Sequence, residues 1–125
     1  MQSHEKWLFK AQSDLNAAKV LYKADCRDVA IYHTEQCAEK ALKGFLAFWK
    51  QPLIKTHDLV ALLALCKQFD SNLSRLSACA ERLTPFGTLF RYPDVDMYPT
   101  KQTLLLAIRD AEKIFDSVTK KISKL

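Results

Sequence analysis

The sequence contains little that would interrupt a helix: 2 glycines and 4 prolines occur in 125 residues. The prolines, Pro52, Pro85, Pro93 and Pro99, stand where helices are expected to end or in a loop. Because glycine and proline are the strongest local turn signals, their scarcity predicts long helices and few turns. The alternation of polar and apolar residues that is typical of strands is also missing, so we expect an all-α protein.

The signals for metal, cofactor and membrane sites are missing as well. The four cysteines are 11, 29 and 13 residues apart, and no CxxC pair occurs, which fits no zinc pattern. Two glycines cannot build a phosphate-binding loop or a dinucleotide fingerprint, and G-x-S-x-G is absent. We therefore expect no metal, no cofactor and no hydrolase site of that type. Without an apolar run of 18 residues or an apolar N-terminal signal region, we expect a cytoplasmic protein that does not bind membranes.

The composition fits a single domain over residues 1–125 with a real hydrophobic core, since 49% of the residues are hydrophobic. The net charge of +5 favours acidic partners such as nucleotides or nucleic acid. An ordinary basic, solvated surface is the alternative interpretation.

Apolar residues at spacings of three and four predict five helices in an antiparallel up-and-down bundle of four long helices plus a shorter one. Ser3 and Asp28 are expected to cap the first two helices, and Thr56 the third. Gly44, inside the second helix, indicates a close approach of a neighbouring helix. The expected ranges are 3–24, 28–50, 56–68, 71 or 72 to 85 or 87, and 100–122. Cys37, Cys66 and Cys79 are expected to be reduced core residues.

Three motifs follow one another along the chain: YHTEQCAEKALKGFL at 32–46, THDLVALL at 56–63 and RYPD at 91–94. In this order the chain resembles the HEPN domain family over nearly its whole length, in particular small prokaryotic HEPN proteins. The resemblance implies a helical homodimer that binds nucleotide or RNA. It also implies a minimal nucleotidyltransferase as partner, in a toxin–antitoxin-like or regulatory pair.

HEPN ribonucleases resemble one another in an Arg-x4–6-His motif before the last helix, and this chain departs from it. Arg91 stands near that place, but no histidine follows His57, so the imidazole that would move a proton is missing. Arg27 and His33 satisfy the motif by count, at the wrong position. We therefore favour a non-enzymatic protein with no catalytic residues. The alternatives are an RNA-cleaving toxin that uses Arg91 or Arg27 with His33 or His57, and a purely structural interaction module.

The candidate nucleotide- or phosphate-binding residues lie in the three motifs. His33, Lys40 and Lys43 are expected on the polar side of the second helix, where lysines can hold phosphate oxygens. Ordinary surface pairing, such as Glu39 with Lys43 four residues apart, is the alternative. His57 opens the third helix, where it can assist anion binding or pack under the loop.

Arg91 and Tyr92 stand in the one long irregular stretch, and loops that are not needed for packing often carry function. Pro93 favours an extended Tyr92, with Arg91 on the opposite side of the backbone. Two interpretations of Arg91 remain open: an ion pair with Glu35 or Glu39 that fixes the loop, or a phosphate pocket shared with Lys40, Lys43 or His57. A homodimer is also expected because the second and last helices are rich in apolar residues. These residues are Ile31, Phe45, Phe48, Trp49, Leu104, Leu105, Leu106, Ile114 and Phe115.

Overall fold

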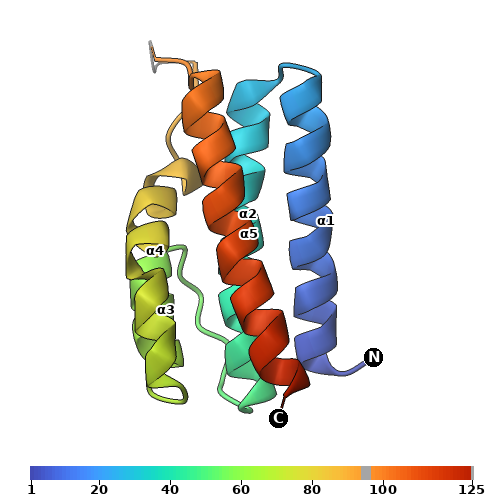
Figure 1. Cartoon of the computed structure of the whole chain (residues 1–125), viewed down its shortest axis with the longest axis vertical. Coiled ribbons are helices and arrows are strands. Elements are labelled where there is room, and N and C mark those ends of the chain that lie inside the picture. Colours follow the sequence, from blue (N-terminus) through green and yellow to red (C-terminus); the bar gives the residue numbers. More distant parts are fainter. Residues whose placement is uncertain (94–96, 125) are drawn as a thin grey trace.

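The structure is a computed structural model that describes residues 1–93 and 97–124. Three long helices, α1 (Ser3–Lys23), α2 (Arg27–Phe48) and α5 (Lys101–Ser123), lie side by side along the molecule (Figure 1). The described residues contain no strand, which confirms the expected all-α bundle. None of the described helices combines the length and the apolar character needed to cross a bilayer.

Two short helices, α3 (Leu59–Cys66) and α4 (Ser77–Leu83), lie on the side of the bundle away from α1. Two 3-10 turns, η1 (Ser71–Leu76) and η2 (Thr84–Gly87), flank α4, where one continuous helix was expected. Figure 1 shows α1 and α4 running in one direction and α2, α3 and α5 in the other. The segment 49–58 therefore returns along the bundle, and α3 is parallel to α2.

The ends of the first two helices differ from expectation. Gln2, and not Ser3, caps α1, since the Gln2 backbone N–H donates to Glu5 Oε1 at 3.1 Å. Helix α2 begins at Arg27, so Asp28 lies in the first helical turn, where its charge suits the helix dipole, rather than at the cap. The helix ends at Phe48, before the expected Lys50, because Lys50 has a left-handed φ of 57°.

Helix α3 starts three residues after the expected cap. Asp58 accepts hydrogen bonds from the backbone N–H groups of Val60 at 3.0 Å and Ala61 at 3.3 Å. Thr56 instead accepts from the backbone N–H of Asp58 at 3.2 Å. The carboxylate reaches two free amide groups of the helix start, whereas the threonine hydroxyl stabilises the turn before it.

Helix α1 comes close to α2 at Gly44, as expected. A Cβ atom placed there would lie 3.2 Å from both Trp7 Cβ and Leu8 Cδ2. Ala11, Leu15 and Ala18 continue the contact along α1, and all are buried.

Cys37, Cys66 and Cys79 are buried free thiols of the core, as the sequence predicts. Burial raises the pKa of the Cys66 thiol to about 12, which makes it unreactive.

Four of the nine apolar residues that led to the expectation of a dimer lie inside the monomer, and four more are half-buried. Ile31, Phe45, Leu104 and Ile114 are fully buried, because α3 and α4 cover the side of α2 and α5 that α1 leaves open. Leu106 stays 46% exposed. The remaining four, Phe48, Trp49, Leu105 and Phe115, are half-buried. The apolar excess of these helices thus serves mainly the internal core.

Candidate functional site

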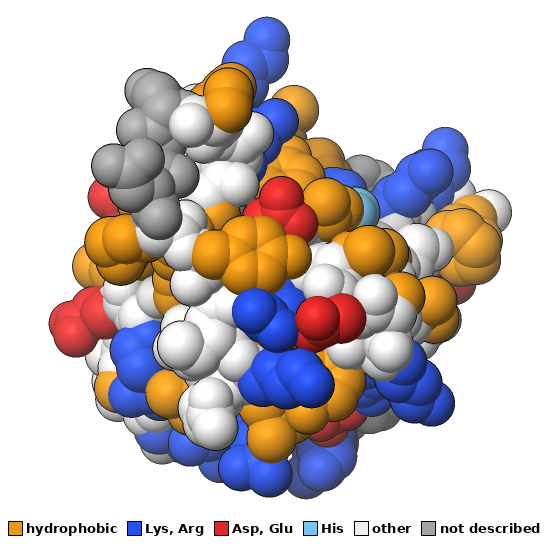
Figure 2. All heavy atoms as spheres, turned by 90° about the horizontal axis from the view of Figure 1, so that it is seen from above, with side chains coloured by type: hydrophobic (Ala, Val, Ile, Leu, Met, Phe, Trp, Pro, Cys, Tyr) orange, Lys and Arg blue, Asp and Glu red, His pale blue; other side chains and the backbone are white. Residues whose placement is uncertain are grey.

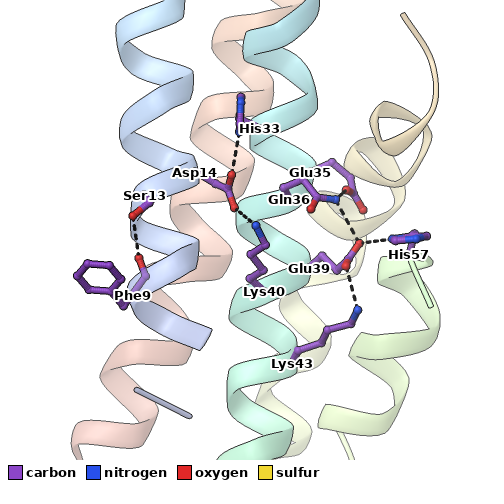
Figure 3. Close-up of polar contacts among 10 residues, drawn as sticks. All are labelled: Phe9, Ser13, Asp14, His33, Glu35, Gln36, Glu39, Lys40, Lys43 and His57. Carbon is purple, nitrogen blue, oxygen red and sulfur yellow. Dashed lines mark hydrogen bonds and ion pairs between the residues drawn. The ribbon is translucent and has the colours of Figure 1, made fainter. Parts of the chain in front are cut away.

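A charged cluster joins α1 to α2 through a buried carboxylate. Asp14, 7% exposed, receives His33 Nδ1 at 2.8 Å on one oxygen and Lys40 Nζ at 2.7 Å on the other (Figure 3). Burial would raise the pKa of Asp14, but the hydrogen bonds and charges of His33 and Lys40 hold it below its ordinary value. His33 and Lys40 therefore connect two helices, and their charge is partly neutralised by Asp14.

A second cluster lies on the neighbouring face of α2, toward α3 (Figure 3). Glu39, 4% exposed, accepts from Lys43 Nζ at 2.9 Å and contacts His57 Nδ1 at 2.8 Å. Gln36 Nε2 donates to Glu35 Oε1 at 2.8 Å and reaches Glu39 Oε1 at 3.5 Å. Lys43 and His57 thus share one buried carboxylate, in the same way that His33 and Lys40 share Asp14.

Glu35 is fully buried, and its Oε2 atom has no hydrogen-bond partner among the described residues. Burial, and next the negative charge of Glu39, raise the pKa of Glu35 to about 8. Its surroundings therefore favour the protonated form of the carboxyl group. A buried carboxylic acid held in its neutral form is a frequent property of functional sites, although structural networks produce it as well.

Arg91 makes neither of the two expected sets of contacts among the described residues. Its guanidinium lies over the Tyr32 ring, 4.3 Å from the centroid, and 5.6 Å from that of Tyr92. Its Nη1 reaches the carbonyl oxygen of Gly87 at 3.5 Å. Arg91 is exposed, and the Tyr92 side chain is 58% exposed. Asp94, the last residue of the RYPD motif, lies outside the described residues.

A pocket of about 170 Å³ lies beside the Arg91–Tyr32 contact. Asp28 and Val29 line it from the first turn of α2, and Tyr32, Phe90 and Arg91 complete it. The left-handed φ of 70° at Phe90 turns the chain here, and its ring stacks on Phe86 at 6.1 Å. A guanidinium, an aromatic face and a carboxylate are thus brought together at one accessible place.

Arg27, the other arginine of the ribonuclease alternative, is engaged at the α1–α2 turn. Its Nε donates to the Pro99 carbonyl at 2.7 Å, its Nη1 pairs with Asp25 at 2.6 Å, and it lies over the Tyr98 ring at 4.8 Å. His33 instead contacts Asp14. The two residues that match the motif by count therefore have separate partners.

Within 1–93 and 97–124, no group of three or more His, Cys, Asp or Glu side chains is arranged to hold a metal ion.

The sequence interpretation missed Asp14 and Tyr32. Asp14 had a signal, because it is three residues after Ala11 and four before Ala18, on the buried side of the first helix. A charged residue at such a position needs a partner. Tyr32 opens the first motif, but no spacing rule connects it with Arg91, 59 positions later in the chain.

The fold and the two clusters define a helical bundle whose central helix carries buried, paired polar residues. The model of the HEPN domain family matches residues 4–122, and the chain belongs to this family. TT1696 from Thermus thermophilus superposes with a TM-score of 0.84 and 25% identity, over 97% of this chain and 99% of that one. ST0689, an archaeal HEPN homologue, superposes with a TM-score of 0.80 and 29% identity, over 98% of this chain and 99% of that one. No curated protein matches the chain in sequence.

Proposed function

We propose that this HEPN protein is a non-enzymatic binding protein that holds nucleotide or RNA at Arg91. The observation that supports the proposal is the exposed guanidinium of Arg91, stacked on Tyr32 at 4.3 Å beside an open pocket. We call Arg91, Tyr32 and Tyr92 the Arg91 platform. Among the described residues Arg91 forms no ion pair, and its Nη1 donates to the Gly87 carbonyl at 3.5 Å.

The chemistry of the Arg91 platform suits a phosphate next to a base. An arginine presents a fork of N–H donors that fits phosphate oxygens, and it stacks on aromatic faces. Tyr92 is exposed, and an exposed aromatic ring can stack on a base of any sequence. Asp28 lines the pocket and can accept a hydrogen bond from an exocyclic amino group. The net charge of +5 would attract such ligands.

The other four candidate residues have a different role in this proposal. His33, Lys40, Lys43 and His57 are each bound to Asp14 or Glu39. A phosphate would have to compete with a carboxylate at 2.7 to 2.9 Å for each of them. We therefore assign them to the positioning of α1, α2 and α3, and the ligand to the Arg91 platform.

We also propose a homodimer, but with its contact at the end of the bundle near Arg91 and not on the apolar residues of α2 and α5 listed above. Val29 (47%), Tyr92 (58%) and Tyr98 (49%) are exposed near Arg91 and Arg27. Figure 2 shows hydrophobic side chains exposed at this end of the bundle, with Lys and Arg side chains beside them. A two-fold contact here would place two Arg91 platforms next to each other. The resemblance to small HEPN proteins supports a minimal nucleotidyltransferase as partner in a toxin–antitoxin-like or regulatory pair.

Binding of ATP and of a fluorescein-labelled eight-nucleotide oligoadenylate, measured by calorimetry and by anisotropy, tests the proposal and separates its two ligand classes. Arg91→Ala should weaken binding by about tenfold or more, equivalent to about 1.4 kcal/mol. Arg109→Ala is the matched control, because Arg109 is an exposed arginine of α5. Equal binding by both variants, or no binding of either ligand by the unmodified protein, would overturn the proposal.

A further inference from the structure

The buried acid Glu35 is in tight contact with the turn that precedes Arg91. A Cβ atom at Gly87 would lie 3.1 Å from Glu35 Cδ, 3.2 Å from Oε1 and 3.3 Å from Oε2. Real Cβ atoms rarely come so close to another atom, so only glycine fits at this position without a shift. Glu35 thus determines how near the η2 backbone can come to α2.

The same turn holds Arg91 from its other side. The Gly87 carbonyl accepts from Arg91 Nη1 at 3.5 Å, and the guanidinium stacks on Tyr32. Tyr32 and Glu35 are three residues apart, so they project from one side of α2. A single helix therefore supports both the guanidinium and the turn that carries it.

Burial and the charge of Glu39 favour the protonated form of Glu35, and they outweigh the hydrogen bond that its Oε1 accepts from Gln36 at 2.8 Å. Glu39 is the nearest like charge, and its partners Lys43 and His57 are already committed to it. Neither η2 (TPFG) nor α3 (LVALLALC) contains a charged residue. On α4, which also packs on α2, Arg82 pairs with Asp110, while Glu81 is exposed. A proton lost from Glu35 would leave a second buried anion beside Glu39, and its Oε2 has no hydrogen-bond partner among the described residues.

We propose that Glu35 is the positioning residue of the Arg91 platform: its protonated carboxyl group seats the Gly87 turn, and loss of the proton releases the turn and Arg91 with it. Water could then solvate the carboxylate. The ligand part of this inference rests on the proposed function, whereas the release of the turn does not. The shift of the Glu35 pKa to about 8 places the transition just above neutral pH.

Hydrogen exchange of the segment 84–91, corrected for the intrinsic pH dependence of exchange, tests the release at pH 7 and pH 9. Protection should fall by about tenfold in the unmodified protein, because one pH unit above the transition favours the ionised form by that factor. Glu35→Gln, a neutral side chain of the same shape, should keep its protection. Glu81→Gln makes the same chemical change on an exposed side chain and should behave like the unmodified protein.

Binding of the labelled oligoadenylate over the same pH range tests the positioning role. It should weaken above pH 8 in the unmodified protein and stay constant in Glu35→Gln. If no oligoadenylate binds at any pH, the proposed function fails, while the exchange measurement still decides the present inference. Equal loss of protection in the unmodified protein and in Glu35→Gln would overturn the present inference. Oligoadenylate binding that stays constant at a pH where the protection of the segment 84–91 is lost would also overturn it.

Gly87→Ala provides a second test should Glu35→Gln not fold. Its added Cβ should separate the turn from Glu35 and lower the protection of the segment 84–91 already at pH 7, with the helix content by circular dichroism unchanged. Oligoadenylate binding should fall with it. Protection and binding equal to those of the unmodified protein would show that the contact does not position Arg91.

Discussion

His57 Nδ1 lies 2.8 Å from Glu39 Oε1, although the His57 side chain is 77% exposed and that of Glu39 only 5%. Lys43 approaches the other oxygen of Glu39 at 2.9 Å and is itself 9% exposed. One buried carboxylate therefore has one buried partner and one partner in solvent. The two contacts differ in energy, because solvent screens the exposed one far more strongly.

Replacing Lys43 by Met should destabilise the protein strongly. It leaves the buried Glu39 without its buried cation, with the exposed His57 and a 3.5 Å contact to Gln36 remaining, and breaking a buried pair costs about 3–5 kcal/mol. His57→Ala should cost less than about 1 kcal/mol, as exposed pairs do. Urea unfolding measures both, with Lys55→Met on an exposed lysine as the control. Similar losses for Lys43→Met and Lys55→Met would contradict this assignment.

Asp14 should contribute stability at neutral pH that is lost in acid. Its folded-state pKa lies below the ordinary value, so the folded chain binds this proton less readily than the unfolded chain. The contribution is present above about pH 4, the unfolded value, and disappears as the pH falls through the lower folded-state pKa. Asp14→Asn should therefore be less stable than the unmodified protein at pH 7, and the difference should shrink toward pH 2. A difference that is independent of pH would rule out this linkage.

Glu35 should make the protein less stable as the pH rises, which is opposite to the effect of Asp14. Its pKa is raised to about 8 in the folded state, so the folded chain keeps a proton that the unfolded chain loses above about pH 4.5. Unfolding free energy should therefore fall as the pH rises from about 4.5 to 8, by up to about 1.4 kcal/mol per unit, and level off above that range. Glu35→Gln should remove this slope and gain stability relative to the unmodified protein by pH 8. Parallel pH profiles of the two proteins in guanidinium unfolding would exclude the effect.

The helices could be located from the sequence because their apolar spacing is strong. Leu59, Leu62, Leu63 and Cys66 of α3 all face the core at this spacing, and so do Ala11, Leu15 and Ala18 of α1. Helix starts were less predictable, since several nearby side chains compete for the same free amide groups. Asp58 caps α3 although Thr56 is an acceptable cap two residues earlier, because the observed chain path brings the carboxylate to two amides.

The candidate site was predictable in residue type but not in pairing. The sequence singled out His33, Lys40 and Lys43 of α2 as candidates, and the structure shows them paired with carboxylates. Asp14 pairs across a helix–helix contact, and Arg91 lies on Tyr32. Both contacts depend on how distant segments fold together, which helical periodicity does not specify. The raised pKa of Glu35 follows first from its burial, which is a property of the folded chain.

Replacing Gly44 by Val should separate α1 from α2. The added Cβ would lie 3.2 Å from Trp7 Cβ and Leu8 Cδ2, and overfilling a packed contact costs about 1–3 kcal/mol. Gly44→Ala should cost less, because alanine gains about 1 kcal/mol in helix preference and Leu8 is a flexible neighbour. Thermal unfolding with Ala47→Val as the control, at a half-buried position one turn further along α2, measures the difference. A Gly44→Val protein as stable as the control would show that the contact between α1 and α2 at Gly44 tolerates a larger side chain.

The protein should not cleave RNA. A cleavage site needs a histidine that can exchange a proton near an arginine that stabilises negative charge, with both directed at the same phosphate. His33 is bound to Asp14, and Arg27 to Asp25 and the Pro99 carbonyl, so this pair does not converge. His57 faces Glu39, while Arg91 stacks on Tyr32.

Purified protein incubated with single-stranded and structured RNA should leave both RNAs intact, and expression of the protein should not be toxic. Cleavage that is lost in His33→Ala or His57→Ala, with the fold retained, would instead establish the ribonuclease alternative. Cleavage that persists in both variants would point to a contaminating nuclease, because no other histidine except His4 is present in the chain.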